Sequence, residues 1–263
     1  AVLRDVDSFA AKAPDKADAL DAQYVKGLAQ AGLKDFAEAA KTYEGILGSA
    51  DRYPAADKVA YELGWAYTEL GKTTEAVAAF RKLAKDYSDS PLAGEALFRV
   101  GESWYDAEDY SKAATAYGET QRKAPGTPIA EKALHKLGWC HLKAEDYGKA
   151  AAAFSTQLSE HPDGELAGDA QFLQGECQFK QDQWKPAQVL YAKVIATKNP
   201  NYAALALYRS GECAGKLEDW PASQKFHQQV LNDYENFEMR PEARYGVGWA
   251  LQNQNKLEDA IQA

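Results

Sequence analysis

Small, apolar and aromatic residues return along this chain at a fixed spacing. Glycine marks the period, and its copies lie 36 or 37 residues apart: Gly27, Gly64, Gly101, Gly138, Gly175, Gly211 and Gly248. A period of this length is typical of repeat architectures, in which each unit packs on its neighbours. We number every repeat so that this glycine is position 8.

The remaining positions of each repeat predict two helices. Positions 3, 7 and 10 share one face of a first helix, because residues three and four apart meet on a helix surface. Positions 17, 20, 24, 27 and 28 form the apolar stripe of a second helix, with small residues at 20 and rings at 24. A polar turn separates the two, and the aspartates expected to cap the second helix are Asp109, Asp146 and Asp219.

The pattern therefore predicts an all-α fold, a right-handed α-solenoid of antiparallel helix pairs over residues 1–263. Full repeats are expected over 20–56, 57–93, 94–130, 131–167, 168–203 and 204–240, with a partial repeat over 241–263. Residues 1–19 are interpreted as the second helix of a truncated preceding repeat. Glycine at position 8 is expected to let the helices approach closely, so that a ring fills the adjoining space.

Composition narrows the functional classes. The net charge of −9 argues against nucleic acid or an anionic membrane as the main partner, and no apolar run is long enough to span a bilayer. Cys140, Cys177 and Cys213 all fall at position 10, a column of small residues, so we expect buried, reduced thiols. No metal site and no cofactor are expected.

The combined pattern is small-x-aromatic-x-x-Gly-x-small, then aromatic-x-x-Ala-x-x-x-Phe/Tyr, then proline, and it resembles the tetratricopeptide repeat. Phrases such as Phe80-Arg81-Lys82-Leu83-Ala84-Lys85-Asp86-Tyr87 and the long period resemble bacterial cell-envelope versions, among them the Tol–Pal-associated periplasmic protein and outer-membrane assembly lipoproteins. That resemblance implies a periplasmic or envelope location. Three unpaired cysteines favour a reducing compartment, so the cytoplasm stays open as the alternative.

In the family this chain resembles, positions 2, 5, 9, 12 and 13 line a concave groove that binds peptides. Here the predicted groove residues are Tyr61, Trp65, Phe98, Glu102, Tyr105, His135, Trp139, Phe172, Glu176, Phe179, Tyr208, Glu212, Tyr245 and Trp249. A basic edge is expected from Lys143, Lys180 and Lys216. The glutamates are expected to meet basic side chains of the ligand. An alternative for position 5 is that its rings pack on one another and serve stability alone.

Three functions are compared. The first is a non-catalytic scaffold that binds a peptide segment of a protein partner, and the second is an array that self-associates end to end through uncapped repeats. The third is an enzyme with His135 beside Glu102 and Trp139, which ranks last because no nucleophile is paired with a base. A carboxylate clamp at Lys132 and Lys136 is rejected, because Glu102 would repel a carboxylate.

Overall fold

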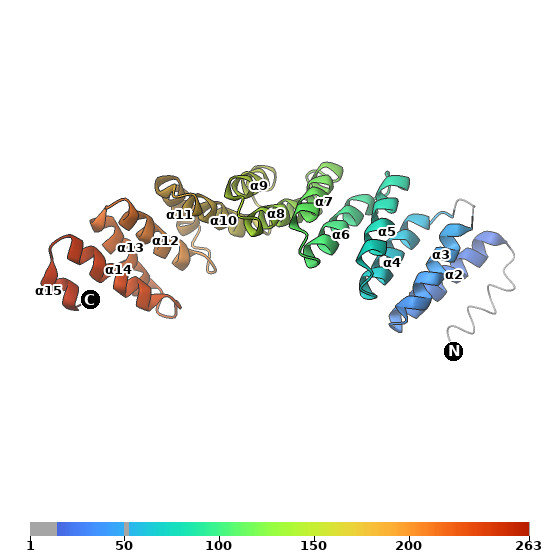
Figure 1. The fold of residues 1–263 in the computed structure, drawn as a ribbon, viewed down its shortest axis with the longest axis horizontal. Coiled ribbons are helices and arrows are strands. Elements are labelled where there is room, and N and C mark those ends of the chain that lie inside the picture. The colour runs from blue at the N-terminus through green and yellow to red at the C-terminus, as the bar shows by residue number, and fades with distance from the viewer. Residues whose placement is uncertain (1–14, 50–52, 263) are drawn as a thin grey trace. The chain divides into compact units, whose positions relative to one another are not determined.

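The computed structural model describes residues 15–49 and 53–262, and within these ranges the chain forms helices and no strands (Figure 1). The first helices of the repeats are α2 (Lys16–Gly32), α4 (Ala56–Glu69), α6 (Leu92–Asp106), α8 (Pro128–Lys143), α10 (Ala167–Lys180), α12 (Ala203–Lys216) and α14 (Arg240–Asn253). The second helices are α3 (Phe36–Gly48), α5 (Thr73–Asp86), α7 (Tyr110–Lys123), α9 (Tyr147–Glu160), α11 (Trp184–Ala196), α13 (Trp220–Asp233) and α15 (Leu257–Gln262). The predicted all-helical pattern of pairs is confirmed.

The expected helix ahead of the first repeat lies mostly outside the described residues. Residues 1–14 are not described, and α2 already begins at Lys16, within the stretch 1–19 assigned to that helix. The preceding repeat therefore stays a prediction.

The turn inside each repeat has one backbone conformation throughout. The residue at position 15 has a positive φ in every repeat, between 57° and 68°. These residues are Lys34, Gly71, Glu108, Glu145, Asp182, Glu218 and Asn255. A left-handed residue ends the first helix and reverses the chain. The aspartate that follows accepts a hydrogen bond from the backbone N–H three residues on, at 3.1 Å for Asp109, Asp146 and Asp219. The predicted caps are confirmed.

The recurring glycine lies beneath the ring at position 24 of its own repeat. A Cβ built on Gly64 would lie within 3.0 Å of the Phe80 ring, and the same holds for the pairs Gly27–Tyr43, Gly101–Tyr117, Gly138–Phe154, Gly175–Tyr191 and Gly211–His227. These rings are all buried. Glycine therefore lets the second helix lay a large ring directly on the backbone of the first.

The chain divides into two compact units, residues 1–133 and 134–263, with the division inside α8. In the first unit each helix from α2 to α7 packs on the next, and α2 and α4 also contact α4 and α6 respectively. In the second unit the same order runs from α9 to α15, and α12 contacts α14. First helices thus lie beside one another within each unit. The single array over 1–263 stays a prediction.

Candidate functional site

The rings at position 5 lie mainly in the core. Phe98, His135, Phe172 and Tyr208 are only 5 to 7 % exposed. Each packs on the position-24 ring of its own repeat, with centroids 5.3 to 5.8 Å apart. The expectation of a solvent-facing spine is therefore wrong for these four residues, because the glycine draws the position-24 ring close enough to cover them. Only Tyr245 is freely exposed, at 71 %, and position 24 of its repeat falls after residue 263, the last of the given sequence.

In the second to fifth repeats, position 9 is matched to the ring at position 24, whereas in the first repeat position 9 is Leu28 and the buried Tyr43 hydroxyl has no hydrogen-bond partner among the described residues. Where that ring is a tyrosine, as in Tyr117 and Tyr191, its hydroxyl donates to Glu102 or Glu176. Where it is phenylalanine, in the second and fourth repeats, position 9 is Trp65 or Trp139 instead. Burial raises the pKa of Tyr191, and the neighbouring Glu176 adds to that shift. A predicted ligand-binding column thus also satisfies buried hydroxyls of the core.

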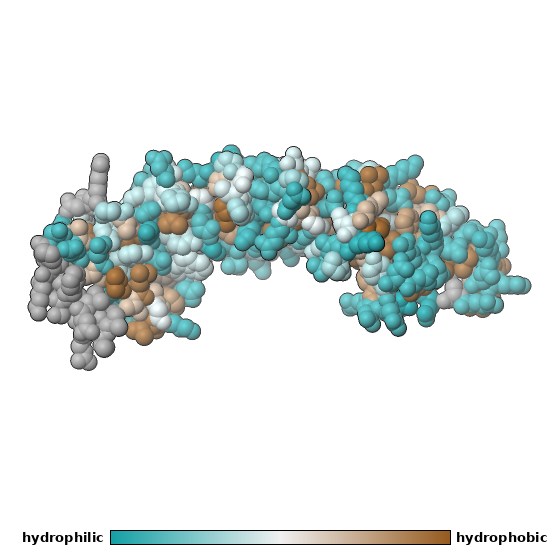
Figure 2. Space-filling model, turned by 180° about the vertical axis from the view of Figure 1, so that it is seen from behind, coloured by the Kyte–Doolittle hydropathy of each residue, from teal (hydrophilic) through white to brown (hydrophobic). Residues whose placement is uncertain are grey.

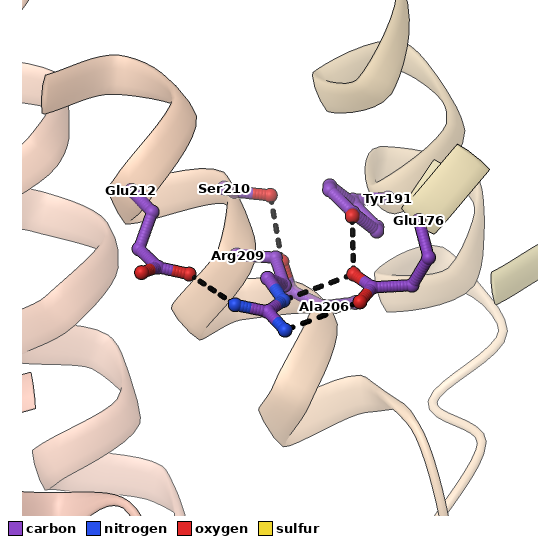
Figure 3. Close-up of polar contacts among 6 residues, drawn as sticks. All are labelled: Glu176, Tyr191, Ala206, Arg209, Ser210 and Glu212. Carbon is purple, nitrogen blue, oxygen red and sulfur yellow. Dashed lines mark hydrogen bonds and ion pairs between the residues drawn. The ribbon is translucent and has the colours of Figure 1, made fainter. Parts of the chain in front are cut away.

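Two of the predicted groove glutamates are held by an arginine of the chain itself (Figure 3). Arg209 donates through Nε and Nη2 to both carboxylate oxygens of Glu176, at 2.9 and 3.1 Å, and through Nη1 to Glu212 at 2.6 Å. Burial acts to lower the pKa of Arg209, but Glu176 and Glu212 outweigh it and raise that pKa. The expectation that these glutamates wait for a basic ligand is corrected at Glu176, whose charge is already balanced.

The Arg209 guanidinium also lies over a ring. Its Cζ is 4.9 Å from the centroid of Phe179, a predicted groove residue of the preceding repeat. Phe179 meets Trp184 edge-on, with centroids 5.1 Å apart, and Tyr105 meets Tyr110 in the same way at 5.3 Å. Position-12 rings are thus half-buried against position 17 of their own repeat.

A second arginine repeats this arrangement in the first unit. Arg99 lies over Trp65 at 4.8 Å, pairs with Glu95 at 2.6 Å and donates to the Tyr61 hydroxyl at 3.3 Å. Both arginines stand at position 6, a column in which no site residue was predicted. Position 6 carries residues of mixed types in the other repeats. An arginine there, one helical turn from a glutamate of the same helix, was the sequence signal that could have indicated an ion pair.

His135 joins three side chains of the second unit. Its Nε2 lies 3.0 Å from both Trp139 Nε1 and Asp169 Oδ2, and its Nδ1 lies 3.2 Å from Gln157 Oε1. Nε2 accepts from Trp139 Nε1–H when it carries no proton and donates to Asp169 Oδ2 when it carries one, and one nitrogen does only one of these. Because the ring is buried, its position suits a structural role and not the catalytic one compared above.

The lysines predicted at the groove edge are exposed at the ends of α8, α10 and α12. They are Lys143, Lys180 and Lys216. Lys216 Nζ lies 6.0 Å from the centroid of Trp184, which is on the neighbouring second helix. Its charge is therefore directed toward α11.

The face formed by α12 and α14 contains a hollow of about 390 Å³. Glu212 and Glu242 line it together with the rings of Tyr245 and Trp249. These two rings are stacked, with centroids 6.3 Å apart and an interplanar angle of 17°, and Trp249 is 47 % exposed. They are the most exposed aromatic residues among those that the sequence predicted. Elsewhere the surface is largely hydrophilic with scattered apolar residues, as Figure 2 shows for one face.

Comparison with known proteins agrees with this geometry. Two models of the tetratricopeptide repeat match residues 61–128 and 169–201. Among solved structures, the C-terminal part of a TPR repeat-containing protein from Cytophaga hutchinsonii is similar over 92 % of both chains, with 15 % identity and a TM-score of 0.67. The chain is a tetratricopeptide-repeat protein.

Other structures similar to this tetratricopeptide-repeat chain show the same fold at low identity. BtubC from P. vanneervenii is 14 % identical, with a TM-score of 0.56 over 73 % of this chain and 85 % of its own. The pilF protein of Pseudomonas aeruginosa is 17 % identical, with a TM-score of 0.50 over 85 % of this chain and 95 % of its own. No curated protein sequence matches the chain. Solenoids of this kind present extended surfaces to protein partners and are generally non-catalytic.

The cysteines of this tetratricopeptide-repeat protein occupy alanine positions. Cys140, Cys177 and Cys213 are buried, as expected, and form no disulfide. Burial raises the pKa of Cys177 and of Cys213 to about 12, so neither thiol is activated as a nucleophile. Within residues 15–49 and 53–262 no cluster of metal-ligating side chains occurs. In the same ranges no helix combines the length and apolarity that a membrane span requires.

Proposed function

We propose that this protein is a non-catalytic scaffold that binds a peptide segment of a protein partner on the face formed by its first helices. The observation that carries the proposal is the hollow between α12 and α14, beside the stacked pair of Tyr245 and Trp249. Tryptophan and tyrosine are the residues most enriched at binding hot spots, and contiguous exposed apolar surface is typical of an interaction site.

The proposal places the binding energy at the carboxyl-terminal repeats. Rings further toward the amino terminus, such as Phe98 and Phe172, are already buried and contribute stability. Trp65 is covered on one face by Arg99. A peptide therefore gains most by covering Tyr245 and Trp249, which together offer a broad apolar surface beside two carboxylates.

The test is a selection of random peptides displayed on phage against the intact chain, followed by affinity measurement on the selected peptides. Replacing Tyr245 and Trp249 by alanine is expected to weaken binding about 30-fold or more, since a hot spot contributes roughly 2 kcal/mol or above. The melting temperature is expected to stay nearly unchanged, because both rings are exposed.

Val189→Ala is the matched control. Val189 is 60 % exposed on α11, a second helix, and its loss is expected to leave peptide affinity unchanged. Peptides that bind the Tyr245→Ala, Trp249→Ala variant as tightly as the native chain would count against this site.

Self-association is the second candidate, and exposed apolar residues on α15 favour it. Leu257 and Ile261 are 59 % and 87 % exposed and line a hollow of about 570 Å³ with residues of α14. A second copy packing there would remove both side chains from water. This surface is the basis for the expected homo-oligomer.

Light scattering over a range of concentrations tests this candidate. The native chain is expected to gain mass with concentration, and Leu257→Glu with Ile261→Glu is expected to remain a monomer. A native chain that stays monomeric at millimolar concentration excludes the idea.

For the compartment we propose the bacterial cell envelope, supported by the resemblance of the long repeats to envelope proteins. Three cysteines that form no disulfide support the cytoplasm as the alternative. Fractionation of the source cells, with an antibody to this chain, separates the two: recovery with the cytosolic marker counts against the envelope.

A further inference from the structure

The chain shows twice how it holds a guanidinium group between two consecutive first helices. Between α4 and α6, Arg99 lies on Trp65 and contacts Glu95 and Tyr61. Carboxylate, tyrosine and flat ring are the partners that suit a planar guanidinium, which stacks and donates several hydrogen bonds at once. We call such a place between neighbouring first helices an arginine slot.

The slot between α10 and α12 uses related partners. Arg209 lies on Phe179. Two carboxylates hold its nitrogens, Glu176 from the preceding repeat and Glu212 from its own (Figure 3). In both slots the arginine comes from position 6 of the second of the two helices. Position 6 is therefore the place from which the chain fills its own slots.

The slot between α12 and α14 keeps a tyrosine and carboxylates but lacks the arginine and the ring on which it lies. Tyr208 stands where the first slot has Tyr61, and Glu242 stands where that slot has Glu95. Position 6 of this last repeat is Gly246. The result is the hollow of about 390 Å³ described above.

Packing keeps this slot open. A Cβ on Gly246 would lie within 3.0 Å of the His227 ring, so the chain has no room for a side chain of its own at this position. Gly215, at position 12, stands where the preceding slot has the Phe179 ring, and it lines the hollow. His227 lines it, is 4 % exposed, and has no hydrogen-bond partner for Nδ1 among the described residues.

We propose that the slot between α12 and α14 binds an arginine side chain of the partner peptide, with the guanidinium between Glu212 and Glu242 and its flat face toward Trp249. This inference rests on the proposed function, since it names the side chain that the peptide would present. The peptide's arginine takes the place that Arg99 and Arg209 take in the other two slots.

The charges around the slot favour a cation. Glu242 is exposed and forms no ion pair within the described residues. Glu212 Oε2 accepts a hydrogen bond from Arg209, and the Glu212 carboxylate also accepts one from the Tyr208 hydroxyl. Arg209 therefore balances part of the negative charge of Glu212 beside the slot. Lys216 also lines the hollow, with its Nζ 6.0 Å from the centroid of the Trp184 ring on α11, so the slot holds one lysine against two carboxylates. Burial holds the pKa of His227 at about 4, so His227 adds no positive charge at neutral pH.

The test is titration of the intact chain with N-acetyl-arginine amide, followed by ¹H–¹⁵N NMR at the Trp249 indole and the Gly246 amide. N-acetyl-citrulline amide has the same shape without charge, and N-acetyl-lysine amide has the charge without the planar group. Arginine is expected to bind at least about 3-fold more tightly than either. Equal affinity for arginine and citrulline overturns the proposal.

Glu242→Gln removes one carboxylate without changing its shape and is expected to weaken arginine binding at least 3-fold. Glu235→Gln is the control, since it changes the net charge equally from the exposed loop after α13 and is expected to have no effect. If both variants weaken arginine binding equally, the effect is one of net charge alone and the proposed slot is rejected.

The phage-selected peptides separate this inference from the proposed function. Enrichment of arginine at one position, lost in a selection against Glu242→Gln, supports the slot. Peptides that need Tyr245 and Trp249 but contain no preferred arginine leave the scaffold standing and reject the arginine slot. A selection that yields no peptide at all rejects both.

Discussion

At the scale of single residues, the repeating glycine and the ring above it form the unit of packing. The Phe80 ring packs directly against Gly64, in the space that a Cβ would occupy. Gly45, within α3, has no heavy atom within 4 Å of where a Cβ would lie. The two glycines therefore differ in physical role although both are helical. One makes room for a ring, and the other only costs the helix conformational entropy.

Gly64→Ala is expected to destabilise the chain by about 1–3 kcal/mol, because the added methyl must displace a buried ring. Gly45→Ala is expected to stabilise it by about 0.5–1 kcal/mol, the ordinary gain in helix propensity. Urea denaturation followed by circular dichroism measures both. Equal effects of the two substitutions would contradict the packing role of Gly64.

His227 stands in the same ring column as Phe80 and Phe154, but it has a titratable ring. Burial lowers its pKa to about 4 from the usual 6.5. The folded state therefore binds this proton less readily than the unfolded state. Stability is unaffected above pH 6.5 and falls as the pH drops from 6.5 toward 4.

His227→Phe is expected to remove that acid-dependent loss, which amounts to roughly 3 kcal/mol for a shift of this size. Denaturation midpoints measured at pH 7 and at pH 4.5 test it, and the gap between the two pH values should narrow in the variant. An unchanged gap would show that His227 is not the group responsible.

At the scale of helices, the turn inside each repeat depends on a left-handed residue at position 15. Gly71 meets that need without strain, while Glu145 adopts φ 57° at a steric cost. Asp146 follows Glu145 directly and caps α9, so the turn and the cap together set where the second helix starts.

Glu145→Gly is expected to stabilise the chain by about 1 kcal/mol, because glycine adopts positive φ freely. Ser155→Gly, at an exposed position within α9, is the control and is expected to destabilise by up to about 1 kcal/mol. Thermal melts of the two variants give the comparison, and a loss of stability in Glu145→Gly would mean that the side chain has a role of its own.

At the scale of the whole molecule, each helix packs on its neighbours in the order of the chain, within both units. Stability in such an array is approximately a sum of repeat and interface terms. A local defect is therefore expected to stay local, and the array need not unfold as one cooperative block.

Hydrogen exchange measured by mass spectrometry tests this expectation. Gly64→Ala should speed exchange in α4 and α5 and leave α12 and α13 at their native rates, and Gly211→Ala should reverse the pattern. Uniform acceleration along the chain in either variant would argue for global cooperativity instead.

The repeat period, the helix pairs, the capping aspartates and the burial of the cysteines all followed from sequence. They could be predicted because the physics behind them is local: a spacing of three or four residues, a cap three residues away, and a small column opposite a ring. Even the reason for the glycine was available, since its partner lies 16 residues downstream in the same repeat.

The exposure of the rings was decided only by the tertiary structure. Phe98, His135, Phe172 and Tyr208 lie on the face expected for the groove, yet the rings drawn over the glycines bury them. Arg209 reaches Glu176 across 33 residues, and no pattern within one helix shows that pair. By itself the sequence determined what one repeat is. Which side chains remain free to bind depends on how consecutive repeats contact one another, because burial and ion pairing join residues of different repeats.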